Sequence, residues 1–297
     1  MSCPGLYCGR VLLPDGSLSD CGPCPRGYRR NESFVCVECS DIPSLYDWLY
    51  LGFMVLLVLV LHWFFIDMVS VRRSFNKDII SLHAVAFAEV FLASVLTLLI
   101  SHPMGSFYIY NCKVRSIKDW YTLFHNPTPN YEKKVHCTQE AVYPLYTTVF
   151  LFFGLCLVLM LIIRPWACRK FLPRQSKMSI YAAMYFIPIL VLIHALIGGL
   201  LFYSFPHLVL ILSVVSCAAH FAVKMDQSIS SLILTTVSEP RNVVILLGHW
   251  CLHAYGIVSL TQLSNPHLHP LLILLVPLPA AFYVLTARFT DPNKSHF

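Results

Sequence analysis

Seven long apolar stretches, separated by shorter polar segments, dominate the hydrophobic pattern of the chain. Each approaches the roughly 20 residues that a helix needs to cross the hydrocarbon core of a bilayer. The pattern therefore predicts an all-α polytopic membrane protein with about seven transmembrane helices. The predicted spans are Trp48–Ile66, Ile79–Ile100, Val142–Ile163, Ile180–Phe202, His207–Val223, Asn242–Leu260 and Leu271–Ala287.

The fourth and fifth spans are separated only by Tyr203–Pro206, so a tight helical hairpin is expected there. Pro206 suits the first turn of a helix, where its missing N–H is not needed. Pro188 and Pro277 lie inside predicted spans and are expected to kink them. The fifth and seventh spans are short, and a re-entrant segment is the alternative for either.

The polar segments complete the predicted organisation. Residues 1–47 form a cysteine-rich head, residues 48–287 the bundle, and residues 288–297 a short tail. Residues 102–141 form a long loop, rich in aromatic side chains, after the second span. This loop is either an ordered cap over the bundle or a binding surface for clients or partners. No cleavable signal peptide is expected in the head, because it lacks an apolar h-region.

Composition agrees with a membrane protein. The chain is 57% hydrophobic and 12% charged, whereas a typical soluble domain is about 45–50% apolar and about 25% charged. The net charge of +6 is not gathered into a basic run, which argues against a nucleic-acid partner. A disordered chain and an ordinary soluble enzyme are excluded as well.

The distribution of basic residues predicts the orientation. With the N-terminus luminal and the C-terminus cytosolic, Lys and Arg are about twice as dense on the inner side, as the positive-inside rule requires. Asn31 begins a glycosylation sequon in the head, which agrees with that orientation. The basic residues assigned to the inner side are Arg72, Arg73, Lys77, Arg164, Arg169, Lys170, Arg174, Lys177, Lys224, Arg241, Arg288 and Lys294.

Most of the cysteines fall on the same predicted luminal side. Two Cys-x2-Cys knuckles in the head have a spacing that would suit a zinc ion in a cytosolic protein. Disulfides are favoured over zinc, because that side is oxidising and so short a head buries little core. Bonds between the two knuckles are expected. Cys112 is expected to pair with Cys137 and so to close the loop after the second span. The disulfide candidates are Cys3, Cys8, Cys21, Cys24, Cys36, Cys39, Cys112 and Cys137.

Ionisable and polar residues inside predicted spans are candidates for function. They are Glu89, His194, His249 and His253. Glu89 should lie near the midplane and face the bundle interior, with His253 or His194 as its partner. A proton relay, a metal site or a hydrolytic centre is one interpretation, and interhelical hydrogen bonding is the other. The second is favoured, because no catalytic motif is present. No catalytic residue, metal or cofactor is therefore assigned.

Three classes of function fit a chain of this kind. A seven-span receptor is disfavoured, because Ile163-Arg164-Pro165 lacks the acidic-Arg-Tyr ending of rhodopsin-like receptors. A transporter is disfavoured, because the two halves show no evident internal repeat. A non-enzymatic membrane scaffold remains, and the receptor and the transporter stay as alternatives.

Several long strings of residues resemble the Jun N-terminal kinase-associated membrane protein family (JAMP), and together they cover essentially the whole chain. The matching strings are GLYCG at Gly5–Gly9, LYDWLYLGFM at Leu45–Met54, LHWFFI at Leu61–Ile66, VHCTQEAVYPLYT at Val135–Thr147, HWCLHAYGI at His249–Ile257 and AFYVLTARFTDP at Ala281–Pro292.

The resemblance implies a non-enzymatic adaptor of the endoplasmic reticulum membrane. Members of the family assist the disposal of misfolded reticulum proteins by bringing proteasomes and other degradation components to the membrane. They bind a membrane-anchored RING-type ubiquitin ligase. They also bind Jun N-terminal kinase and influence how long its stress signal lasts.

Overall fold

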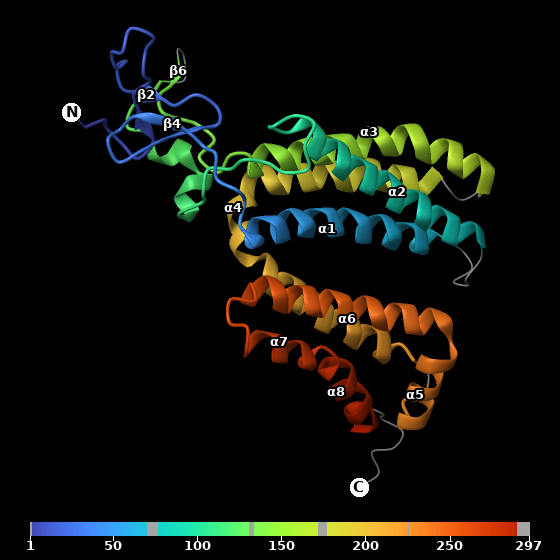
Figure 1. Ribbon diagram of the computed structural model, residues 1–297. Helices are drawn as coiled ribbons and strands as arrows, with labels where there is room; N and C mark the ends of the chain where they lie inside the picture. The colour runs from blue at the N-terminus through green and yellow to red at the C-terminus, as the bar shows by residue number, and fades with distance from the viewer. Residues whose placement is uncertain (1, 70–76, 131–133, 172–176, 225, 290–297) are drawn as a thin grey trace. The chain divides into compact units, whose positions relative to one another are not determined.

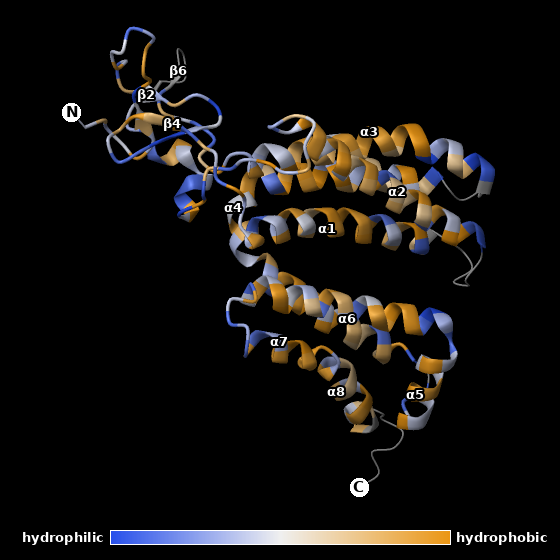
Figure 2. Ribbon diagram, viewed as in Figure 1, coloured by the Kyte–Doolittle hydropathy of each residue, from blue (hydrophilic) through white to orange (hydrophobic). Residues whose placement is uncertain are grey.

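The computed structural model describes residues 2–69, 77–130, 134–171, 177–224 and 226–289, and these are mainly helical (Figure 1). The chain divides into two compact units, Met1–Tyr203 and Ser204–Phe297. Six helices in the described ranges are long and apolar enough to cross a membrane. Their hydrophobic residues run along nearly their whole lengths (Figure 2). The chain is therefore an all-α polytopic membrane protein, as the sequence predicts.

The first unit contains α1 (Leu45–Val69), α2 (Lys77–Ile100), α3 (Leu145–Phe171) and the beginning of α4 (Lys177–Ala222). α2 packs against both α1 and α3. A reciprocal capping contact fixes the start of α1: Ser44 N donates to Asp47 Oδ2 at 2.8 Å, and Asp47 N donates to Ser44 Oγ at 3.3 Å. The head lies beside the N-terminal end of α1 (Figure 1).

Tyr203–Pro206, the expected link between the fourth and fifth spans, are helical, so the break between these spans does not lie there. α4 consists of two helices joined across a kink, and its 46 residues are enough for two of the predicted spans. The helical dihedral angles are interrupted instead at Ile197. Pro206 leaves the Phe202 carbonyl without its helical donor, and the Tyr46 hydroxyl donates to that oxygen at 2.6 Å.

The second unit contains the rest of α4, α5 (Ile229–Ser238), α6 (Pro240–Thr261), α7 (His269–Leu272) and α8 (Leu278–Thr286). α5 lies between the fifth and sixth predicted spans, where the sequence predicted no helix. The seventh predicted span is broken at Pro277, as expected, into α7 with the 3-10 turn Ile273–Leu275 on one side and α8 on the other. The core of this unit is formed by Cys217, Phe221, Leu232, Ala280 and Ala287.

The head consists of short antiparallel pairs. β1 (Cys8–Gly9) pairs with β2 (Gly22–Pro23), and β3 (Tyr28–Arg30) pairs with β4 (Cys36–Glu38). The loop between α2 and α3 adds two 3-10 turns, Ile117–Trp120 and Thr122–His125. It also adds a third pair, β5 (Pro129–Asn130) with β6 (Lys134–Val135). Pairs of two or three residues have little stability alone, so the head depends on covalent and polar links.

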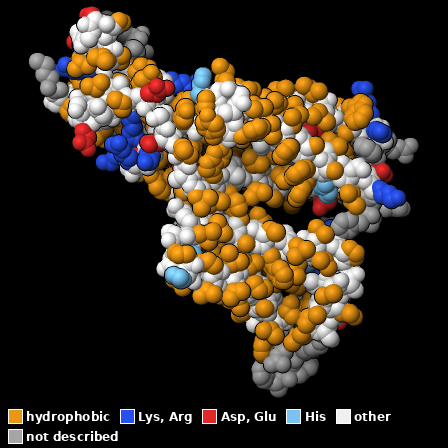
Figure 3. Space-filling model, viewed as in Figure 1, with side chains coloured by type: hydrophobic (Ala, Val, Ile, Leu, Met, Phe, Trp, Pro, Cys, Tyr) orange, Lys and Arg blue, Asp and Glu red, His pale blue; other side chains and the backbone are white. Residues whose placement is uncertain are grey.

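Polar residues gather at the two ends of the first unit. Figure 3 shows Lys and Arg side chains on the head and at the opposite end of the helices, with hydrophobic side chains between them on the visible face. Arg72, Arg73, Arg174 and Lys294 lie outside the described residues. Arg164 is an exception to the predicted pattern, because α3 continues past it to Phe171. Its side chain is fully buried inside the bundle.

Candidate functional site

Four disulfides connect the eight cysteines that were expected to lie on the oxidising side. Their Cα–Cα distances of 4.8 to 5.6 Å are ordinary for disulfides. The four knuckle sulfurs take part in three separate bonds, which differs from the convergence that a zinc ion needs. The bonds are Cys3–Cys21, Cys8–Cys137, Cys24–Cys36 and Cys39–Cys112.

The expected pairing of Cys112 with Cys137 is wrong. Backbone pairing explains the difference, because Asn111 N donates to Asp41 O at 2.8 Å and so holds the end of the head beside the loop. That contact places Cys112 next to Cys39. Two of the four disulfides therefore join the head to the loop between α2 and α3, and the two segments must lie on the same side of the membrane.

Asp119 lies at the centre of a polar network between the head and this loop. It accepts hydrogen bonds from the Tyr7 hydroxyl at 3.0 Å and from Arg29 Nη2 at 3.1 Å to each carboxylate oxygen. The backbone N–H groups of Arg115 and Ser116 also donate to it, at 2.8 and 3.3 Å. Burial and the nearby carboxylate raise the pKa of Tyr7 well above its usual value, so its hydroxyl remains a donor.

The same loop inserts Trp120 into the end of the bundle. Its ring lies 5.9 Å from Tyr50 and 5.3 Å from Phe202, measured between centroids. Gly199 makes this approach possible, because a Cβ there would stand 2.8 Å from the Trp120 Cβ. The loop is therefore an ordered cap that reaches between the helices.

Tyrosine hydroxyls hold the interrupted part of α4. Tyr146 OH donates to the Ala195 carbonyl at 3.1 Å, and Tyr50 OH lies 3.4 Å from the Gly198 carbonyl. The Ala195 carbonyl lies just before the break at Ile197 and the Gly198 carbonyl just after it, so the two hydroxyls bind on both sides of the break. We call this group the α4 clamp; its members are Tyr46, Tyr50, Trp120 and Tyr146.

His194 lies within the α4 clamp and not beside Glu89. Its Nε2 lies 3.1 Å from the Tyr146 carbonyl, and its Nδ1 lies 3.4 Å from the Tyr50 hydroxyl. The ring is also packed against Phe150, with centroids 4.9 Å apart. This environment gives the histidine a packing and hydrogen-bonding role between helices.

Glu89 faces the bundle interior, as predicted, but its partner is Arg164. Arg164 Nε lies 3.1 Å from each carboxylate oxygen, and Nη2 donates to one of them as well. The side chains are 1% and 0% exposed. His62 of α1 approaches the same guanidinium, with Nδ1 3.4 Å from Nη2. One polar cluster therefore joins α1, α2 and α3 inside the membrane.

This cluster is only partly satisfied by the described residues. Arg164 Nη1 and His62 Nε2 are buried and have no hydrogen-bond partner among them. A buried charge pair in a low-dielectric interior is costly when it is incomplete. The prediction of a histidine partner for Glu89 failed because Ile163-Arg164-Pro165 looked like the end of a span. A charge beside a proline is the usual signal for such an end.

His249 and His253 lie in α6 and contact serines of α4 within the second unit. His253 Nδ1 lies 2.8 Å from Ser213 Oγ, and His249 Nδ1 lies 3.1 Å from Ser216 Oγ. Ser213 Oγ also lies 2.8 Å from the Leu210 carbonyl, so the serine has polar neighbours on both α4 and α6.

The glycosylation candidate lies on the surface of the head. Asn31 is exposed in the turn between β3 and β4, where its side chain accepts a hydrogen bond from Val35 N at 2.9 Å. In the part of the chain that the structure describes, no group of three or more His, Cys, Asp or Glu residues is arranged to hold a metal ion. The sequence gives no signal for the polar roles of Asp119 and His62, because their partners are distant along the chain.

Taken together, the apolar helices, the disulfide-linked head and the intramembrane ion pair define a polytopic membrane protein with an oxidised extramembrane cap. A model of the JNK1/MAPK8-associated membrane protein family matches residues 3–292. The chain therefore belongs to that family, which confirms the resemblance found in the sequence.

Three relatives support this assignment. The chain is 44% identical to JNK1/MAPK8-associated membrane protein of Homo sapiens and 45% identical to that of Mus musculus. It is 31% identical to JNK1/MAPK8-associated membrane protein homolog of Caenorhabditis elegans. Each comparison covers 99% of this chain and 95% of the relative. No solved structure matches the chain.

Proposed function

We propose that this protein is a non-enzymatic adaptor of the endoplasmic reticulum membrane, with a luminal N-terminus and a cytosolic C-terminus. It helps to degrade misfolded reticulum proteins, and it modulates the duration of Jun N-terminal kinase signalling. Its organisation follows the sequence: a luminal head of residues 1–47, a bundle of residues 48–287 with its cap loop, and a cytosolic tail of residues 288–297. Most of the tail lies outside the described residues.

The observation that carries the orientation is the pair of disulfides between the head and the loop after α2. Stable disulfides belong to oxidising compartments, which supports a luminal head. The exposed sequon at Asn31 supports the same side. Lys77, Arg169 and Lys170 lie at the opposite end of the first unit's helices, in agreement with the positive-inside rule.

The partners of this adaptor are proposed from the family. They are a RING-type membrane ubiquitin ligase, proteasome subunits and other components of reticulum-associated degradation, besides the lipid bilayer itself. The names of the human and mouse relatives add support for Jun N-terminal kinase as a partner. Binding to nucleic acid forms no part of the proposal.

Depletion of the protein tests the degradation role. We expect a misfolded reticulum client to have a longer half-life in depleted cells, measured by a translation-arrest chase. Re-expression of the wild type should restore turnover. Re-expression of Ser213→Ala with His253→Gln should also restore it, because that change removes no catalysis. An unchanged client half-life on depletion would refute the adaptor role.

The kinase role has a separate readout. After an acute stress, the decay time of Jun N-terminal kinase phosphorylation should change on depletion and return on re-expression. Partners that co-purify in mild detergent then separate the candidate classes. Proteasome and ligase subunits support the adaptor, whereas G-protein or arrestin partners would point to a receptor.

Glycosylation tests the orientation. Glycosidase treatment should increase the electrophoretic mobility of the wild type, and Asn31→Gln should abolish that change. A second sequon at Asn293, outside the described residues, is expected to be cytosolic and unused. A glycan that survives Asn31→Gln and disappears in Asn293→Gln would reverse the orientation.

A further inference from the structure

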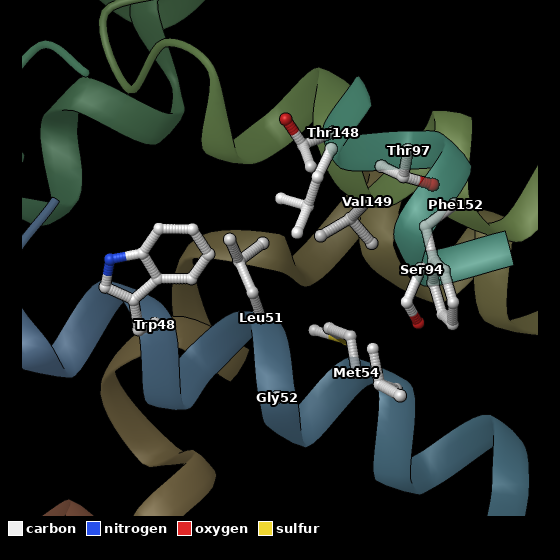
Figure 4. A pocket seen from close by; sticks show the side chains of 11 residues that line it. Trp48, Leu51, Gly52, Met54, Ser94, Thr97, Thr148, Val149 and Phe152 are labelled. Carbon is white, nitrogen blue, oxygen red and sulfur yellow. The ribbon is translucent and has the colours of Figure 1, made fainter. Parts of the chain in front are cut away.

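An apolar cavity of about 210 Å³ opens between α1, α2 and α3. It lies at the head end of these helices, because its lining comes from the first turns of α1 and α3 and the last turns of α2. Figure 4 shows side chains of the three helices converging around it. The lining includes Trp48, Leu51, Met54, Ser94, Val149 and Phe152.

The Ser94 and Thr97 hydroxyls of the lining make no demand on an occupant. Ser94 Oγ donates to the Val90 carbonyl at 2.9 Å, and Thr97 Oγ1 donates to the Ala93 carbonyl at 2.7 Å. Both hydroxyls are therefore satisfied within their own helix. The rest of the lining is almost entirely apolar. Water needs two to four polar partners to occupy a buried site, so this cavity favours an apolar guest.

The size and position of the cavity indicate which class of molecule it binds. Engineered apolar cavities of about 150 Å³ remain dry and bind benzene-sized molecules, so this cavity admits a somewhat larger group. Leu51, Val55 and Leu98 of the lining are only half-buried, which makes the cavity continuous with the lipid-facing surface of the spans. The molecules that meet this surface at that depth are lipid acyl chains.

We propose that the cavity between α1, α2 and α3 binds the acyl chain of a bilayer lipid, with Trp48 at the head end of the site. Transfer of a chain from bulk lipid gains no hydrophobic energy, because both environments are apolar. The gain comes from contacts that an empty cavity lacks. A bound chain therefore packs the head end of the three helices, whereas the Glu89–Arg164 pair joins α2 and α3 further along. This inference does not depend on the adaptor role.

A phospholipid with a photoreactive diazirine in its acyl chain tests the proposal on the full-length protein in nanodiscs. We expect cross-links enriched in peptides that contain residues 48–55, 94–98 and 148–152. Val149→Phe fills the cavity and should reduce those cross-links at least tenfold. Val158→Phe is the matched control, because Val158 is exposed on the same helix, and it should leave them unchanged.

A second variant and a second readout guard against misfolding. Ser94→Leu fills the cavity from α2 and should reproduce the effect of Val149→Phe. In lipid-depleted detergent, added phosphatidylcholine should raise the thermal midpoint of the wild type and of Val158→Phe, but not that of Ser94→Leu. Cross-linking spread evenly over the lipid-facing surface, or unchanged in both filled variants, would overturn the proposal.

Discussion

Two buried carboxylate–arginine pairs are built differently. The head pair joins Asp119 of the cap loop to Arg29 of the head, and the bundle pair joins Glu89 of α2 to Arg164 of α3. Asp119 in the cap loop has five donor contacts, from a tyrosine, an arginine and two backbone N–H groups. Arg164 is the hydrogen-bond donor to Glu89 in the described structure. The arginine of the head pair is 13% exposed, whereas that of the bundle is fully buried.

This difference follows from the two environments. Beside water, a loop backbone can turn its N–H groups toward a carboxylate, and the arginine is one donor among several. Inside a span the backbone groups are already used by the helix, so a buried charge depends on side chains from neighbouring helices. The Glu89–Arg164 pair should therefore matter more to stability than the Asp119–Arg29 pair.

The largest expected effect is the loss of the buried arginine. Arg164→Met leaves Glu89 as an uncompensated charge, and breaking a buried pair in this way costs about 3–5 kcal/mol. We expect a strongly reduced thermal midpoint and yield in detergent. Arg169→Met is the control, because Arg169 lies exposed at the end of the same helix. Adding Glu89→Gln to Arg164→Met should recover part of the loss; no recovery would contradict the direct pairing.

Removal of a head-to-loop disulfide should come next. The double variant Cys39→Ser with Cys112→Ser frees a bridge that spans 73 residues, and native disulfides of this kind contribute about 2–4 kcal/mol. We expect faster limited proteolysis between α2 and α3. The double variant Cys24→Ser with Cys36→Ser opens a bridge of only 12 residues and should leave that loop more protected. Equal cleavage rates would argue against the link between head and cap.

The close approach of Trp120 to α4 predicts a smaller effect. Gly199→Ala places a Cβ 2.8 Å from the Trp120 Cβ, and overpacking of this kind costs about 1–3 kcal/mol. The thermal midpoint should fall, and Trp120 fluorescence should shift to longer wavelength. Gly154→Ala is a matched control, since a Cβ there meets nothing within 4 Å. If both variants unfold at the same temperature, the α4 clamp is not tightly packed.

The smallest expected effect is on the pH dependence of stability, and it comes from Glu140, a carboxyl group of the cap loop. Burial raises the pKa of Glu140 above its ordinary value, despite hydrogen bonds from Thr147 and the nearby Arg26. A raised carboxyl pKa in the folded state means that its ionisation destabilises folding, so stability falls as pH rises through that pKa. Glu140→Gln should therefore gain stability relative to the wild type between pH 4 and pH 8. A difference that is constant with pH would exclude this titration.

Much of the membrane architecture could be predicted, because hydrophobic span length is a strong constraint. The inward direction of Glu89 could also be predicted, because an unpaired acid facing hydrocarbon is costly. Its partner could not, because Arg164 beside Pro165 has the pattern of a helix end, yet α3 continues beyond it. The position of the break between the fourth and fifth spans was wrong for a related reason. The helix continues through Pro206, where Tyr46 of another helix donates to the Phe202 carbonyl, and it is interrupted at Ile197 instead. The disulfide partners of Cys112 and Cys137 likewise depend on which backbone segments meet.

Two double-mutant cycles test the central comparison most directly. One combines Glu89→Gln with Arg164→Met, the other Asp119→Asn with Arg29→Met, and both are measured by equilibrium unfolding in the same detergent. The account predicts a coupling energy for the bundle pair that is several times that of the head pair, which should be near 1 kcal/mol. A head coupling equal to or larger than that of the bundle would contradict the claim that the intramembrane pair is the more important link.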